Sequence, residues 1–304
     1  MGYTAEFNRM VTEERNPRTM DLDTLDTLSL VTRVQEEDLE VAQVVKKCLP
    51  EIARAVDLIY ERMSQGGRLF YFGAGTSGRL GVLDATECSP TFGVSPDLIQ
   101  ACIAGGKEAM FRSFENAEDD KNAGIADVET VKLTDKDVLV GITASGRTPY
   151  VLGAAQAAKE RGAAVIALVN NAGTDLERLA DVTICAVVGP EALSGSTRMK
   201  AGTAQKMVLN LLSTCTMVRM GKVYENLMVD LKPTNEKLRE RAVSIISTIT
   251  GVPRHVAEGA LVASHDNAKT AILMVKRKIG RAQAEALICK CNGSLRKALE
   301  ASLM

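Results

Sequence analysis

Two short segments rich in glycine, serine and threonine are the residues of this chain best suited to bind a ligand. The first, residues 73–81, reads Gly-Ala-Gly-Thr-Ser-Gly-Arg-Leu-Gly and directly follows the apolar run 68–72. A strand that enters such a turn and continues as a helix presents backbone N–H groups at the helix N-terminus, where the helix dipole favours an anion. A short hydroxyl such as that of Ser77 can add a donor to a phosphate oxygen. We therefore expect a phosphate-binding turn formed by Gly75, Thr76, Ser77 and Gly78.

Two nucleotide-binding motifs and a plain turn are alternatives for this segment. A P-loop requires a lysine after its last glycine, and no lysine follows Gly78. Gly73, Gly75 and Gly78 nearly match the dinucleotide fingerprint, but the second expected strand ends in residues 105–107, Gly-Gly-Lys, without the acidic residue that this fold uses. A tight turn with no ligand stays open at this point.

The second segment, residues 141–149, repeats the arrangement of the first. An apolar strand ends in Thr143, and Pro149 can open a helix with Thr148 as its N-cap. Two such loops on one sheet predict a cradle for a phosphorylated small molecule, with the second loop contributing Ser145, Gly146, Arg147 and Thr148. A third polar patch precedes the long helical pattern from Met199 and predicts further hydroxyls and positive charge from Ser196, Thr197 and Lys200.

Proton transfer is expected to fall to carboxylates, because the only two histidines, His255 and His265, lie in late helical segments far from the loops. Glu87 is predicted near the C-terminus of the helix that follows the first loop, where the dipole disfavours its ionised form. An unperturbed Glu has a pKa of about 4.3, so a raised pKa would make Glu87 a usable proton donor at pH 7. From spacing alone, a solvated Glu87 is the favoured interpretation.

The acidic run 115–120 contains the second candidate, Glu118. Such runs are usually solvated faces or helix caps, and Asp119 or Asp120 is placed to cap the helix that follows. A metal site would need ligands from elsewhere, and no histidine is placed to supply them. We therefore expect no metal.

Composition limits the classes of protein to consider. The chain has 304 residues, 46% of them apolar, which allows one large or two modest domains. A net charge of −1 gives no electrostatic footprint for nucleic acid or for an anionic membrane. No apolar run approaches the ~20 residues of a membrane span, and the first residues lack the plan of a signal peptide. An odd count of seven cysteines, mostly within apolar patterns, indicates buried thiols, so we expect a cytoplasmic protein.

Short apolar runs alternate with helical segments, which predicts an α/β fold with a doubly wound parallel sheet of about five strands. Strands are expected at 68–73, 98–104, 137–143, 163–170 and 182–187. Helices are expected between them at 78–88, 107–113, 120–131, 149–161 and 174–179. Ligands bind beyond the carboxyl ends of such strands, which selects the loops 73–78, 104–107 and 143–148.

Helical patterns flank the expected sheet on both sides. A polar arm at 1–20 precedes helices over 36–64, which Pro50 is expected to divide. A long helix is expected from Met199 to Arg219, and residues beyond 233 read as all-helical. The predicted organisation is an arm with N-terminal helices (1–64), a sugar-phosphate-binding domain (65–232) and a small helical subdomain (233–304).

The motifs together resemble those of N-acetylmuramic acid 6-phosphate etherases, within the sugar isomerase (SIS) fold family. They occur in order over nearly the full length: Gly73–Gly81 continuing through Asp84–Cys88, Ala104–Gly106, Glu115–Asp119, Ala144–Tyr150, Gly195–Thr203 and Asn226–Asp230. The resemblance implies a flavodoxin-like SIS sheet and a cytoplasmic lyase of cell-wall amino-sugar recycling. Such a lyase cleaves the D-lactyl ether of N-acetylmuramate 6-phosphate to N-acetylglucosamine 6-phosphate and D-lactate.

The same resemblance implies roles for the two glutamates. It makes Glu87 the proton donor and Glu118 the second active-site acid, and it favours catalysis by Glu87 where spacing did not. Our hypothesis is that Glu118 takes the C2 proton while Glu87 protonates the departing ether oxygen. A homodimer with active sites near the subunit interface is also implied, with no metal or redox cofactor.

Two other functions share this fold. A non-catalytic sugar-phosphate sensor of the glucokinase-regulator type has much of the motif set, but such regulators tend to be longer, with a duplicated SIS domain. An aldose–ketose isomerase would often open the sugar ring with a histidine, and both histidines here lie outside the matched motifs.

Overall fold

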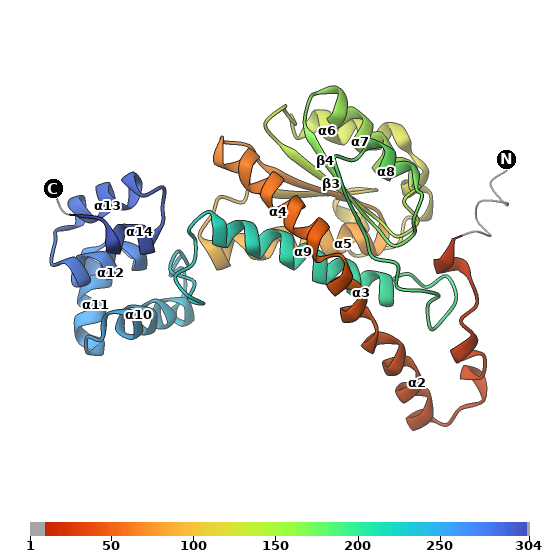
Figure 1. Ribbon diagram of the computed structural model, residues 1–304, viewed down its shortest axis with the longest axis horizontal. Coiled ribbons are helices and arrows are strands. Elements are labelled where there is room, and N and C mark those ends of the chain that lie inside the picture. Colours follow the sequence, from red (N-terminus) through yellow and green to blue (C-terminus); the bar gives the residue numbers. More distant parts are fainter. Residues whose placement is uncertain (1–9, 303–304) are drawn as a thin grey trace. The chain divides into compact units, whose positions relative to one another are not determined.

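The computed structural model describes residues 10–302, so the first nine residues of the predicted arm lie outside the described part. Contacts divide the chain into two compact units, coloured by sequence in Figure 1. One comprises residues up to Ala85 together with Asp97–Ser213, and the other comprises Thr86–Pro96 together with residues from Thr214 onward. The domain limits expected at 64/65 and 232/233 stay a prediction, since contacts do not test independent folding.

A five-stranded parallel sheet forms the centre of the first unit, in the spatial order β2-β1-β3-β4-β5 (Figure 1). Its strands are β1 (Leu69–Gly73), β2 (Ile99–Ile103), β3 (Val138–Thr143), β4 (Ala164–Val169) and β5 (Val182–Cys185). The predicted doubly wound parallel sheet is therefore confirmed. This strand order is flavodoxin-like, and its topological switch point lies between β1 and β3, where a ligand crevice is expected.

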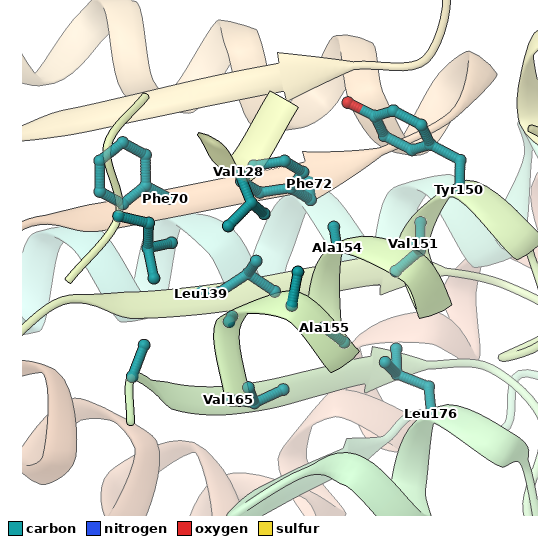
Figure 2. Close-up of a cluster of buried hydrophobic side chains, with 14 of the residues drawn as sticks. Phe70, Phe72, Val128, Leu139, Tyr150, Val151, Ala154, Ala155, Val165 and Leu176 are labelled. Atoms are coloured by element: carbon teal, nitrogen blue, oxygen red, sulfur yellow. The ribbon is translucent and has the colours of Figure 1, made fainter. Parts of the chain in front are cut away.

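The strands form where the sequence is apolar without alternation, because helices cover both faces of a parallel sheet. Every residue of β1, β3 and β4 is buried. Helix α7 (Pro149–Glu160) lays small side chains such as Ala154 and Ala155 against the sheet, and the Phe72 and Tyr150 rings lie 6.2 Å apart (Figure 2). The core on this face also includes α6 (Lys121–Thr130) and α8 (Asp175–Leu179).

The remaining helices of the first unit include the long helix predicted from Met199 to Arg219, which begins one residue later, and a helix longer than the predicted 78–88. They are α2 (Thr27–Leu39), α3 (Val41–Lys47), α4 (Leu49–Ser64), α5 (Gly75–Phe92) and α9 (Lys200–Arg219), of which α5 and α9 continue into the second unit. The helical stretch is divided near Pro50 as predicted, because α3 ends at Lys47 and Pro50 lies in the first turn of α4, where its missing N–H costs no hydrogen bond. A short 3-10 turn, η4 (Lys107–Met110), replaces the helix expected at 107–113, and a second one, η5 (Glu115–Asp119), follows it.

The second unit is helical, as predicted for residues beyond 233. It contains α10 (Glu236–Thr250), α11 (Arg254–Ala263), α12 (Ala268–Arg277), α13 (Arg281–Lys290) and α14 (Leu295–Glu300) around an apolar core. The buried Lys269 Nζ donates to the Asp230 carboxylate at 2.6 Å and to the carbonyls of Gly221 and Gly293, which joins three connecting segments. Over residues 10–302, no helix combines the length and apolar character that a membrane span requires.

Candidate active site

The loop after β1 is a turn that only glycine permits at two positions. A Cβ on Gly78 would lie 2.6 Å from the Gly73 carbonyl oxygen, and one on Gly73 would lie 2.7 Å from the Gly78 nitrogen. The chain therefore reverses tightly and α5 begins at Gly75, within the loop, where φ is +52°. The Gly78 N–H donates to the Ala74 carbonyl at 3.2 Å. The N–H groups of Gly75, Thr76 and Ser77 precede it in the first turn of α5, have no acceptors inside the helix and are available to an anion.

The loop after β3 is held in shape by its own hydroxyl groups. Thr143 Oγ1 lies 2.7 Å from Thr148 Oγ1 and 3.3 Å from Ser145 Oγ, and it accepts a bond from the Gly146 N–H. Thr148 occupies the N-cap position of α7 as predicted, but its side chain makes no capping bond because it pairs with Thr143. The loop is thus ordered before any ligand arrives.

A cavity of about 430 Å³ lies at the carboxyl ends of β1 and β3. It gathers eight of the thirteen predicted site residues, which are Gly75, Thr76, Ser77, Glu118, Ser145, Arg147, Thr148 and Thr197. The switch point of the sheet therefore carries the predicted cradle, and we call this cavity the main pocket.

Charge in the main pocket is divided between one guanidinium and three carboxylates. Among the described residues that line it, Arg147 is the only cation, and its buried Nε has no hydrogen-bond partner. A buried donor without a partner is costly unless a ligand satisfies it. Glu13, Glu118 and Asp119 supply the negative charge. Desolvation, with a smaller contribution from Asp119, raises the pKa of the Glu118 carboxyl above its ordinary value.

The role expected of Ser77 needs correction. Its side chain lines the main pocket, but its hydroxyl donates to Gln205 Oε1 at 2.8 Å. Gln205 is buried and in turn donates to Asn170 Oδ1 at 2.9 Å. The hydroxyl proton is therefore engaged within the protein, and the backbone of the loop offers the donors at this point.

Five predicted site residues do not line the main pocket. Gly78 and Gly146 allow the close approach of chain segments that gives the loops their shape. A Cβ on Gly78 would lie 2.6 Å from the Gly73 oxygen, and one on Gly146 would lie 2.3 Å from the Thr174 side chain. Ser196 lies just beside the lining residues Gly195 and Thr197. The other two, Lys200 and Glu87, lie elsewhere.

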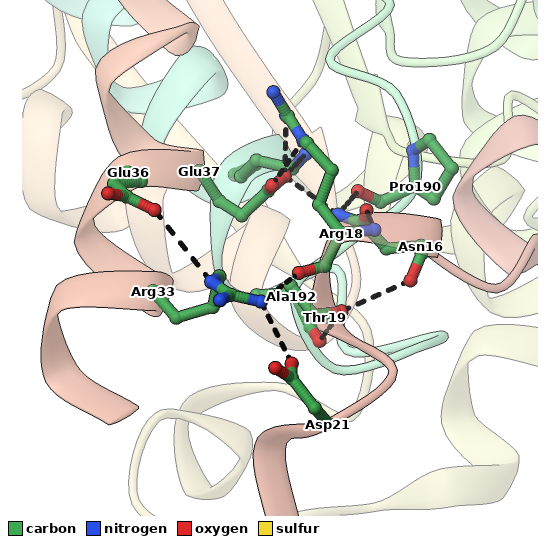
Figure 3. Close-up of polar contacts among 10 residues, drawn as sticks. Asn16, Arg18, Thr19, Asp21, Arg33, Glu36, Glu37, Pro190 and Ala192 are labelled. Atoms are coloured by element: carbon green, nitrogen blue, oxygen red, sulfur yellow. Dashed lines mark hydrogen bonds and ion pairs between the residues drawn. The ribbon is translucent and has the colours of Figure 1, made fainter. Parts of the chain in front are cut away.

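Lys200 is a structural residue, contrary to the prediction. Its ammonium group is 2.7 Å from the Glu37 carboxylate, and both side chains are 2% exposed. Glu37 also accepts from Arg18 and Asn16 (Figure 3). Burial alone would raise the pKa of Glu37, but these hydrogen bonds outweigh it and hold the pKa below its ordinary value. The positive charge of Lys200 is thus already neutralised.

This ion-pair cluster fastens the N-terminal arm to the site. Thr19 Oγ1 donates to the Ala192 carbonyl at 2.8 Å (Figure 3), and Asn171 donates to Thr12 Oγ1 at 3.0 Å. The arm consequently contributes Met10, Thr12 and Glu13 to the wall of the main pocket. Sequence reasoning missed these residues because nothing local to the arm indicates what it packs against.

Glu87 is exposed and lies well along α5. It is 12 residues after Gly75, which is more than three helical turns along the sequence of α5. The helix continues through Pro90 to Phe92, so Glu87 is not in its last turn as predicted. The dipole argument for Glu87 is correspondingly weaker.

Metal binding has no visible support in the described part of the chain. Residues 10–302 contain no group of three or more His, Cys, Asp or Glu side chains arranged to hold a metal ion.

The fold and the main pocket together define an SIS-domain protein. Residues 122–214 match the SIS domain model, residues 51–159 match the glucokinase regulatory protein N-terminal SIS domain, and residues 225–292 match the C-terminal lid domain of glucokinase regulatory protein. A phosphoheptose isomerase from Francisella tularensis has a similar fold, with a TM-score of 0.51 and 18% identity over 64% of this chain and 100% of that one.

Sequence comparison gives a narrower assignment. The chain is 52% identical to N-acetylmuramic acid 6-phosphate etherase 2 of Vibrio cholerae serotype O1, over 97% of this chain and 96% of that protein. It is 50% identical to the N-acetylmuramic acid 6-phosphate etherase of Clostridioides difficile, over 97% of each chain. The chain therefore belongs to the N-acetylmuramic acid 6-phosphate etherase family.

Proposed function

We propose that the main pocket is the active site of this lyase and that Glu118 and Glu87 transfer its protons. The chain is a carbon–oxygen lyase that cleaves the D-lactyl ether of N-acetylmuramate 6-phosphate, giving N-acetylglucosamine 6-phosphate and D-lactate in amino-sugar recycling. The observation that carries the site assignment is the position of Glu118 in the same pocket as the two phosphate-type loops.

The 6-phosphate binds between the loops that follow β1 and β3. The helix N-terminus at Gly75 supplies backbone donors, and Arg147 supplies a guanidinium whose Nε lacks a protein partner. Arginine suits a phosphate because its planar donors can bind two oxygens at once. Ser145, Thr148 and Thr197 add hydroxyl groups from the pocket wall.

The reaction proceeds by elimination and hydration, because direct displacement at an ether carbon is difficult. In the open-chain sugar the aldehyde acidifies the C2 hydrogen, and Glu118 removes that proton. The C3–O bond breaks, its electron pair stays on the lactate oxygen, and Glu87 protonates that oxygen. Water then adds to C3 of the unsaturated aldehyde and a proton returns to C2. The raised pKa of Glu118 makes it a stronger base than an ordinary glutamate.

Glu87 reaches this site from a second copy of the chain. Its side chain is exposed and does not line the main pocket of its own chain. An active site shared between two subunits of a homodimer would supply this carboxylate from the partner.

The outer face of α2 supports self-association. Leu28, Val31 and Leu39 are 74%, 55% and 62% exposed. At 100° per residue they lie within an arc of about 80°, while Glu37, the one buried residue of α2, lies on the opposite side. The exposed side of α2 is therefore an apolar stripe, while its buried side carries the Glu37 carboxylate. An exposed apolar stripe of this kind is suited to pack against another chain.

The expected compartment and cofactor requirement follow from chemistry. None of the seven cysteines forms a disulfide, which is typical of a reducing cytoplasm. The overall reaction exchanges an ether for a hydroxyl with no net oxidation, so it needs no redox cofactor. The sensor alternative is not favoured, because relatives about half identical over almost the whole chain are named etherases.

The proposal is tested by incubating the protein with N-acetylmuramate 6-phosphate in water enriched in oxygen-18. We expect D-lactate without the label and N-acetylglucosamine 6-phosphate with one labelled oxygen at C3. Label in the lactate would mean that the bond on the lactyl side breaks, and no release of lactate would favour the non-catalytic sensor.

A further inference from the structure

A second, smaller cavity adjoins the main pocket. It has a volume of about 190 Å³ and is lined by Ala74, Gly75, Arg79, Ala104, Ala109, Ser113, Phe114 and Glu118. Ala74, Gly75 and Glu118 line both cavities. We call this cavity the side pocket. A ligand whose reacting carbon is at Glu118 can therefore extend into both.

Arg79 is the only cation among the described residues that line the side pocket, and the backbone holds it in place. Its Nε donates to the Met110 carbonyl at 3.3 Å and its Nη2 donates to the Arg112 carbonyl at 3.0 Å. A guanidinium has five N–H donors, so these two bonds orient the group and leave Nη1 available to an acceptor. Both acceptors are carbonyl oxygens, which carry no full charge, so these two bonds do not neutralise the guanidinium.

The other lining groups define what that acceptor is. The Ser113 hydroxyl can donate a hydrogen bond, and Ala104, Ala109 and the Phe114 ring provide small apolar surfaces. A short carboxylate that carries a methyl group matches this combination of one fixed cation, one hydroxyl and an apolar wall. A phosphosugar ring or a second phosphate does not need the apolar wall.

The substrate of the proposed reaction has two negative groups separated by the reacting carbons. One is the 6-phosphate, for which the main pocket provides Arg147, and the other is the carboxylate of the lactyl group on O3. The two cations, Arg147 and Arg79, line different cavities, which share Ala74, Gly75 and Glu118. With Glu118 at the C2–C3 bond, each of the two anionic groups of the substrate can be bound by a different cation.

We propose that the side pocket binds the D-lactyl group and that Arg79, assisted by Ser113, recognises its carboxylate and determines specificity. This inference rests on the proposed function. It predicts that the protein distinguishes a lactyl ether from a plain alkyl ether of the same sugar phosphate through Arg79. Binding the carboxylate also fixes the ether oxygen beside Glu118, so that O3 leaves from one defined position.

The test compares two ligands that differ only in the carboxylate, N-acetylmuramate 6-phosphate and 3-O-ethyl-N-acetylglucosamine 6-phosphate. Binding is measured in the Glu118→Gln variant, so that the comparison does not depend on turnover. We expect Arg79→Gln in this background to weaken binding of the lactyl ligand about 10- to 100-fold, as for loss of a charge-assisted hydrogen bond. The affinity for the ethyl ligand should change less than about threefold, and this retained binding also shows that the variant is folded.

Matched variants separate the possible outcomes. Arg147→Gln should weaken both ligands, because both carry the phosphate, and Arg79→Lys should retain part of the preference because it keeps the charge but not the planar fork. The inference would be overturned if Arg79→Gln weakened binding of both ligands equally, or if it weakened binding of neither. Failure of the wild-type protein to release lactate would instead refute the proposed function, whatever Arg79 does.

Discussion

Lys200 Nζ lies 2.7 Å from Glu37 Oε2, with both side chains 2% exposed, and this contact joins α2 to the first residue of α9. The Glu191 carboxylate, also buried, accepts the backbone N–H groups of Lys200 and Ala201 at 2.9 Å each. At the start of α9, buried Glu37 thus pairs with the Lys200 side chain and buried Glu191 accepts its backbone N–H group. Lys200 follows Thr197, a residue of the pocket wall, by three positions in the sequence.

Removing one member of this pair should destabilise the protein strongly. Lys200→Met leaves the Glu37 charge buried with fewer partners, and we expect a loss of about 3 kcal/mol in the free energy of unfolding, measured with urea. The double variant Glu37→Leu/Lys200→Met removes both charges and should recover most of that loss. Arg178→Ala, which breaks the exposed pair with Asp175, serves as the control at less than about 1 kcal/mol. A Lys200→Met variant as stable as this control would contradict the structural role.

The loop after β1 should not tolerate a side chain at Gly78. In Gly78→Ala the new Cβ would lie 2.6 Å from the Gly73 oxygen and from Ile103 Cγ1, so backbone must move. We expect a loss of at least about 2 kcal/mol in stability and loss of substrate binding. Gly259→Ala on α11 has no atom within 4 Å of its Cβ and should be neutral or slightly stabilising. Normal binding by Gly78→Ala would exclude the tight turn as the phosphate site.

The acid limb of the pH–rate profile should follow the environment of Glu118. The base must be ionised, so activity falls as the pH drops through its pKa, which burial and Asp119 raise above the ordinary value of about 4.3. Asp119→Asn removes the repulsion of one neighbouring charge, and the acid limb of kcat/KM should move to lower pH. It should stay above the ordinary value because desolvation, the larger cause, remains.

Asp120→Asn makes the same change of charge one residue later and is the matched control. The Asp120 side chain caps α6 by accepting from the Ala123 N–H, and it does not line the main pocket. The acid limb of kcat/KM in Asp120→Asn should therefore lie at the same pH as in the wild-type protein. An Asp119→Asn profile that coincides with that of Asp120→Asn would mean that Glu118 is not the group that titrates.

Mixing two inactive variants tests whether each site uses two subunits. Glu87→Ala and Glu118→Ala should each be inactive alone. If Glu87 comes from a second copy, a mixed dimer contains one site with both glutamates intact, and activity should return on mixing and subunit exchange. If both residues serve the site of their own chain, every site in the mixture lacks one carboxylate and activity stays absent. The control mixes Glu118→Ala with Glu87→Ala/Glu118→Ala, which has no intact site in either case.

Much of the fold was predictable because its signals are local. The runs that form β1, β3 and β4 are apolar at every position or nearly so, and glycines with hydroxyl residues mark the loops at the strand ends. Those signals predicted the sheet and the two loops that form part of the wall of the main pocket. They placed Thr148 correctly at the start of α7, although its side chain bonds to Thr143.

The parts that sequence reasoning missed depend on contacts between distant segments. Lys200 looked available for a ligand, but its partner Glu37 is 163 residues away along the chain. Glu13 enters the pocket because Thr12, Asn16 and Thr19 fasten the arm to Asn171 and to residues near position 190. The side pocket was missed for the same reason, since Arg79 and Ser113 meet through the fold and share no motif.

Deuterium incorporation during turnover tests the central claim, that Glu118 removes the C2 proton of a phosphosugar held between the two loops. In deuterated water the wild-type protein should release D-lactate and place one deuterium at C2 of each N-acetylglucosamine 6-phosphate formed. Glu118→Gln should still bind the sugar phosphate but incorporate no deuterium and release no lactate above background. Incorporation at C2 by Glu118→Gln at the wild-type rate would contradict the account.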